Sequence, residues 1–124
     1  MHSEGGGGLA PLLKTELEKA KQKGLKPVIY IGATWCKPCK AIKGYREDPM
    51  MLDALSGTYV IDLDIDEWKP PDLRPFGFNA GVVPYFYVVD GEGRSTGRTI
   101  TSSVWAEDIP VNMAPPLKAF FAGS

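Results

Sequence analysis

Two cysteines separated by two residues, placed directly after an apolar run, constrain this chain more than any other feature. Residues 28–31 (Val-Ile-Tyr-Ile) are followed by residues 34–40 (Thr-Trp-Cys-Lys-Pro-Cys-Lys), which hold the only cysteines of the 124 residues. A nearly continuous apolar run predicts a strand buried on both faces. Residues 39–45 are compatible with a helix. The cysteines are therefore predicted to lie in a turn that opens a helix.

A cysteine at a helix N-terminus is placed for reactivity. Unpaired backbone N–H groups and the positive end of the helix dipole face such a sulfur and stabilise its thiolate, the reactive form. Cys36 lies at the turn and is expected to be the attacking thiol, whereas Cys39 lies a turn deeper. Lys37 and Lys40 add positive charge nearby. We therefore expect the pKa of Cys36 to be lower than that of a free cysteine.

Two neighbours of the cysteines have expected roles of their own. Pro38 suits the first turn of a helix and stiffens the spacing between the two sulfurs. Trp35 precedes the first cysteine and would offer an apolar surface for a substrate. The pattern indicates thiol–disulfide exchange, in which the second thiol resolves a mixed disulfide formed by the first.

Composition limits the other possibilities. The chain is 44% hydrophobic and 23% charged, as expected for a soluble globular protein, and 124 residues suit one domain. A net charge of −1 does not suggest a nucleic-acid partner. No apolar run approaches the roughly 18 residues of a membrane span. Residues 1–8 read as a flexible glycine-rich leader and residues 9–124 as the domain. We expect a monomer, cytoplasmic as the sequence stands, or periplasmic or otherwise extracytoplasmic if a signal segment has been removed.

Hydrophobic periodicity and turn residues predict an α/β fold. Strands joined through helices favour parallel pairing, and residues 90–93 (Asp-Gly-Glu-Gly) predict a hairpin that adds an antiparallel edge. The expected architecture is a mixed sheet with helices on both faces. Helices are expected at 9–23, 36–45, 50–55 and 115–122, one helical turn within 72–78, strands at 27–32, 59–66, 85–89 and 97–101, and an irregular connection at 102–113.

Other interpretations of the polar residues carry less weight. A structural zinc site needs four ligands, and the two cysteines are accompanied only by His2 in the leader. A purely structural disulfide would close a very small loop and would stabilise little. A copper(I) site on the two thiolates is a further alternative. Asp62, Asp64 and Asp66 also suggest calcium, but Glu67 follows them where a calcium loop has glycine.

Residues 35–40 (Trp-Cys-Lys-Pro-Cys-Lys) resemble the Trp-Cys-Gly-Pro-Cys-Lys active site of thioredoxins, with lysine in place of glycine. Residues 82–85 (Val-Val-Pro-Tyr) resemble the cis-proline segment of that family. The resemblance implies a thioredoxin-like fold and thiol–disulfide oxidoreduction on protein or peptide substrates. It implies Cys36 as nucleophile, Cys39 as resolving thiol, Pro84 as the cis-proline and Val83 as the residue whose backbone docks the substrate.

The same resemblance implies that no metal or organic cofactor is needed, because the cysteine pair carries the two electrons, and that an upstream thiol reductant recharges the pair. Residues 40–51 are similar to the helix, Asp-Pro and short helix of secreted thioredoxin-like proteins, including the C-terminal domain of the bacterial transmembrane reductase DsbD. The alternatives of a different class are a redox-inactive binding module with the thioredoxin fold and a copper-handling protein.

The chain also departs from the family pattern. Thioredoxins usually carry a buried aspartate six positions before the first cysteine, and Tyr30 occupies that position here. We hypothesise that the acid is relocated: Asp62 approaches Cys39 from the neighbouring strand, half-buried in an apolar setting that raises its pKa, and deprotonates that thiol. The alternative is that Asp62 is solvated near the strand end.

Overall fold

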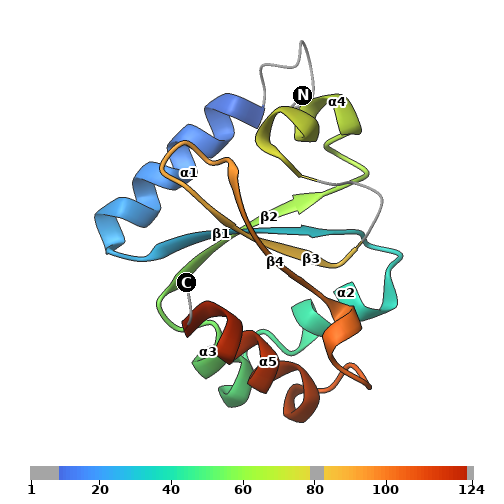
Figure 1. Ribbon diagram of the computed structural model, residues 1–124. Coiled ribbons are helices and arrows are strands. Elements are labelled where there is room, and N and C mark those ends of the chain that lie inside the picture. Colours follow the sequence, from blue (N-terminus) through green and yellow to red (C-terminus); the bar gives the residue numbers. More distant parts are fainter. Residues whose placement is uncertain (1–8, 79–82, 123–124) are drawn as a thin grey trace.

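The computed structural model describes residues 9–78 and 83–122 (Figure 1). The predicted leader with His2, and Val82 of the proline segment, lie outside the described residues. Four strands form one mixed sheet in the order β2-β1-β3-β4. β1 pairs with β2 in parallel, whereas the β1–β3 and β3–β4 pairs are antiparallel. The strands are β1 (Lys26–Gly32), β2 (Thr58–Asp64), β3 (Tyr85–Val89) and β4 (Ser95–Thr101).

Helices cover both faces of the sheet (Figure 1). α1 (Leu9–Lys23) and α4 (Pro70–Leu73) lie on one face. On the other face lie α2 (Lys37–Gly44), α3 (Pro49–Ala54) and α5 (Pro110–Ala122). Two short 3₁₀ helices, η2 (Arg74–Phe76) and η3 (Ser102–Val104), complete the described elements. The predicted α/β class, with a mixed sheet between helical layers, is confirmed.

The sheet separates two hydrophobic cores, because successive side chains of a strand point to opposite faces. In β1, Val28 and Tyr30 pack with the helices on the α2 side, whereas Ile29 and Ile31 pack with α1. The α2-side core also contains both cysteines, so the disulfide belongs to one face of the sheet. Its other buried members include Ile42, Met51, Phe86, Met113, Leu117 and Phe121.

Local sequence explains where the helices around the site begin. α2 has Cys36 as its N-cap and a proline in its first turn, the position where a missing N–H costs nothing. α3 begins at Pro49, and the Asp48 carboxylate accepts a hydrogen bond from Met50 N at 2.9 Å. The predicted break before Pro49 is therefore confirmed as a capped helix start. Among the described residues, no helix is both long enough and apolar enough to cross a bilayer.

Two predictions about the fold are wrong. The last helix begins at Pro110 rather than at residue 115, and it contains Pro115 and Pro116. Prolines disfavour helix interiors, but Met113 and Leu117 are fully buried on either side of them, and this packing outweighs the lost hydrogen bonds. β3 runs antiparallel to β1, although a helical segment precedes it. The connection brings the chain to the C-terminal end of β1, where Tyr85 pairs with Ile31, so β3 starts there and runs back along β1.

Candidate active site

The two cysteines form a disulfide at the N-terminus of α2, with 5.2 Å between their Cα atoms. Cys36 is the N-cap residue, in an extended conformation, and its Sγ accepts a hydrogen bond from Cys39 N at 3.3 Å. Helix N-caps usually satisfy this N–H with a side-chain oxygen. A sulfur here faces the free N–H groups and the positive end of the helix dipole. The predicted placement of Cys36 at a helix start is confirmed.

Both cysteines are buried in the α2-side core, next to exposed residues of the turn. Cys36 is 6% exposed and Cys39 2% exposed, so the first cysteine is the more accessible one. Trp35 is 61% exposed, which leaves its indole available as a contact surface beside the cysteines. Lys37 is exposed, and Pro38, in the first turn of α2, is half-buried.

The Val83–Pro84 peptide bond is cis, as the resemblance implied. Pro84 directly precedes Tyr85, which pairs with Ile31 near the end of β1. The proline therefore lies at the end of the sheet where β1 finishes and the chain continues to Cys36. Pro84 is buried, and Val83 packs against both hydrophobic cores.

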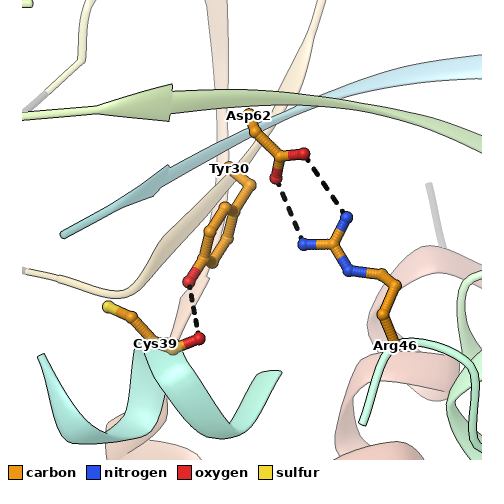
Figure 2. A network of polar contacts seen from close by, with 4 residues as sticks. All are labelled: Tyr30, Cys39, Arg46 and Asp62. Atoms are coloured by element: carbon orange, nitrogen blue, oxygen red, sulfur yellow. Dashed lines mark hydrogen bonds and ion pairs between the residues drawn. The ribbon is translucent and has the colours of Figure 1, made fainter. Parts of the chain in front are cut away.

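Tyr30 lies between the sheet and α2, and its hydroxyl points toward Cys39 (Figure 2). Its side chain is 1% exposed, and its hydroxyl donates a long hydrogen bond of 3.5 Å to the Cys39 carbonyl. The ring packs against Phe86, with 4.9 Å between the ring centres. It also lies over Gly32, where an added Cβ would stand 2.8 Å from the ring. Burial raises the pKa of the Tyr30 hydroxyl well above its ordinary value, so this group stays protonated.

Asp62 lies next to Tyr30 across the β1–β2 pair. Its carboxylate accepts hydrogen bonds from Arg46 Nη2 at 3.1 Å and Nη1 at 3.5 Å (Figure 2). The predicted half-buried, apolar setting is wrong: the side chain is 40% exposed, and a guanidinium from the loop after α2 reaches it. Whether Asp62 takes part in proton transfer stays a prediction.

A cavity of about 710 Å³ opens between α2 and the end of β2. Cys39, Tyr30 and Asp62 all line it, so the inner cysteine adjoins a space that water can enter. Side chains of both charge signs line it. Lys40 and Lys43 come from α2, and Asp64, Asp66 and Glu67 come from the end of β2 and the turn that follows. Over residues 9–78 and 83–122, no group of three or more His, Cys, Asp or Glu side chains is arranged to hold a metal ion.

Comparison with solved structures shows which fold carries this site. The crystal structure of disulphide isomerase from Xylella fastidiosa Temecula1 matches with a TM-score of 0.62 and 18% identity, over 91% of this chain and 88% of that chain. This chain has the thioredoxin fold. Thioredoxin O2 from Arabidopsis thaliana, in its oxidized state, matches with a TM-score of 0.46 and 25% identity, over 74% of this chain and 76% of that chain. No family model and no curated protein matches the chain.

Sequence reasoning missed Arg46 and Gly32 as residues of the site on this thioredoxin fold. Arg46 lies seven positions after Cys39 in a stretch rich in charge, and nothing in the local sequence indicates that it turns back toward β2. Gly32 had a detectable signal: a glycine two positions after a buried tyrosine, on the same face of a strand, leaves room for the ring.

Proposed function

We propose that this protein is a thiol–disulfide oxidoreductase that acts on disulfides or thiols of proteins or peptides. The observation that carries the proposal is the disulfide itself: Cys36 caps α2, and its Sγ accepts a hydrogen bond from Cys39 N. This hydrogen bond and the dipole of α2 would stabilise a Cys36 thiolate after reduction. A sulfur held in this way is a good nucleophile and a good leaving group.

The reduction of a substrate disulfide proceeds in two exchanges. The Cys36 thiolate attacks one sulfur of the substrate, the substrate S–S bond breaks, and a mixed disulfide forms as one substrate thiolate leaves. The Cys39 thiolate then attacks Cys36 Sγ, which releases the second substrate thiolate and restores the Cys36–Cys39 disulfide. Two electrons pass to the substrate, and its thiolates take up two protons from water. An upstream dithiol reductant regenerates the cysteine pair, and the reverse sequence oxidises a substrate dithiol.

The neighbouring residues have proposed roles in this cycle. Lys37 adds positive charge beside the thiolate, and Pro38 fixes the first turn that separates the two sulfurs. Trp35, with most of its surface exposed, contacts the apolar part of a substrate. The backbone of Val83, held before the cis peptide bond to Pro84, pairs with an extended substrate segment. We expect the protein to act as a monomer.

The test is equilibration of the protein with glutathione buffers of graded ratio, with the oxidised fraction read by thiol alkylation. A reversible two-electron midpoint that disappears in Cys36→Ser is the expected result. Cys39→Ser should instead accumulate a mixed disulfide with glutathione, because the resolving thiol is missing. A pair that never reaches equilibrium with glutathione would refute the oxidoreductase proposal and favour a redox-inactive binding module.

A further inference from the structure

Arg46 makes an unusual set of contacts for a residue in a surface loop. Its two terminal nitrogens bind the Asp62 carboxylate, and its guanidinium lies 5.7 Å from the centre of the Tyr30 ring. The side chain is only 26% exposed, and its Nε is buried without a hydrogen-bond partner among the described residues. A buried donor without a partner is costly. The contacts with the Asp62 carboxylate and the Tyr30 ring offset this cost and hold Arg46 in place (Figure 2).

These contacts connect Arg46 to the cysteine pair by two routes. The first is mechanical: the guanidinium covers the outer face of Tyr30, whose hydroxyl reaches the Cys39 carbonyl. The second is electrostatic: Asp62 lines the cavity beside Cys39, and Arg46 neutralises the charge of that carboxylate. Lys40 and Lys43 also face this cavity, and so do Asp64, Asp66 and Glu67. Acidic groups therefore outnumber lysines there, and without Arg46 the cavity would become more negative.

We propose that Arg46 is a positioning residue that sets the reduction potential of the Cys36–Cys39 pair, by neutralising Asp62 and bracing Tyr30 against Cys39. The inference rests on the oxidoreductase function proposed above. Reduction of the disulfide produces a thiolate, and a nearby negative charge destabilises a thiolate. Arg46 therefore favours the reduced pair and makes the protein a stronger oxidant than it would be with Asp62 alone.

The two members of the ion pair give shifts of opposite sign. Arg46→Met keeps an unbranched side chain over Tyr30 but removes the charge, so the potential should fall. Asp62→Asn leaves the guanidinium charge uncompensated, so the potential should rise. We expect each change to alter the equilibrium constant with glutathione by about two- to fivefold, as for a partly exposed ion pair. Arg46→Lys retains the charge and should stay closer to wild type than Arg46→Met.

A matched control separates this local effect from a change in net charge. Lys19 forms an exposed ion pair with Glu16 on α1, across the sheet from the disulfide (Figure 1). Lys19→Met removes the same charge and should leave the potential unchanged. Thermal unfolding of the oxidised variants checks that each one is folded. If Arg46→Met does not fold, Asp62→Asn alone tests the predicted sign of the shift in reduction potential.

Three results would overturn the inference. One is an unchanged or raised potential in folded Arg46→Met. Another is a fall in Arg46→Lys as large as in Arg46→Met, which would make packing rather than charge responsible. The third is slower resolution of mixed disulfides by Asp62→Asn at every pH without a rise in potential, as expected for a relocated acid. The absence of a reversible couple in the wild type would instead refute the proposed function, and the inference with it.

Discussion

Replacing Tyr30 separates the contribution of its ring from that of its hydroxyl. Tyr30→Phe removes only the hydroxyl, whose bond to the Cys39 carbonyl is 3.5 Å long, at the limit of a hydrogen bond. A hydrogen bond of normal length contributes about 0.5–1.5 kcal/mol net, so we expect a loss near the lower end, about 0.5 kcal/mol. The ring contacts with Phe86, Gly32 and Arg46 all remain.

Tyr30→Ala removes the ring as well. The ring is almost completely buried, and its loss leaves a cavity between the sheet and α2. Truncation of a buried aromatic side chain costs about 3–5 kcal/mol. The two variants should therefore differ several-fold in their loss of stability, although both remove the same hydroxyl.

Urea unfolding of the oxidised proteins, followed by tryptophan fluorescence, measures both free energies of unfolding. If the free energy of unfolding falls with urea concentration at the same slope in both variants, then both expose a similar amount of surface on unfolding, and their stabilities can be compared directly. A loss above about 2 kcal/mol in Tyr30→Phe would refute this reasoning, since a hydroxyl with one long hydrogen bond cannot account for it. In that case the contact with Cys39 must be much stronger than its length indicates.

Three further predictions follow from charges and titrating groups. Burial raises the pKa of Tyr30, so in the folded state this hydroxyl stays protonated to a higher pH than in the unfolded state, where its pKa is about 10. The free energy of unfolding should therefore fall as the pH rises above about 10, and less steeply in Tyr30→Phe, as urea titrations at each pH would show. Lys37→Gly should lower the reduction potential measured with glutathione, and an unchanged or higher value would contradict the role of Lys37. Tyr59 donates a 2.6 Å hydrogen bond that lowers the pKa of Glu16, so NMR titration of Tyr59→Phe should find that pKa raised, and an unmoved pKa would mean that Lys19 and Lys23 control it.

The sequence was sufficient for the parts of the fold that depend on local pattern. The apolar strand β1, the cysteines at the start of α2 and the alternation in β2 all follow from residue spacing. In β2, Ile61 and Leu63 pack on the α1 side, and Asp62 lies beside Tyr30 on the opposite face. The cis bond before Pro84 came only from the resemblance to thioredoxins, because an X–Pro dipeptide alone favours trans.

The features that could not be predicted depend on contacts between distant parts of the chain. Asp62 was placed on the correct face, but its setting depends on Arg46, which lies 16 residues earlier in the chain and reaches it only in the folded protein. The start of α5 was misplaced because two prolines signal a helix boundary. The burial of Met113 in the α2-side core explains why the helix begins earlier, at Pro110, and only tertiary structure shows this burial.

Because Tyr30 lies so close to Gly32, the substitutions that evolution can accept at one of these positions depend on the residue at the other. While tyrosine is present, alanine at position 32 would place its Cβ 2.8 Å from a ring that is packed against Phe86. If a shorter side chain such as aspartate replaced the tyrosine first, the three nearest contacts of an added Cβ at position 32 would be removed, since all three are atoms of Tyr30. Once alanine was fixed, the tyrosine could not return without a clash. The two substitutions are therefore accessible in one order only. While position 32 remains glycine, position 30 can change from tyrosine to aspartate and back again without a clash.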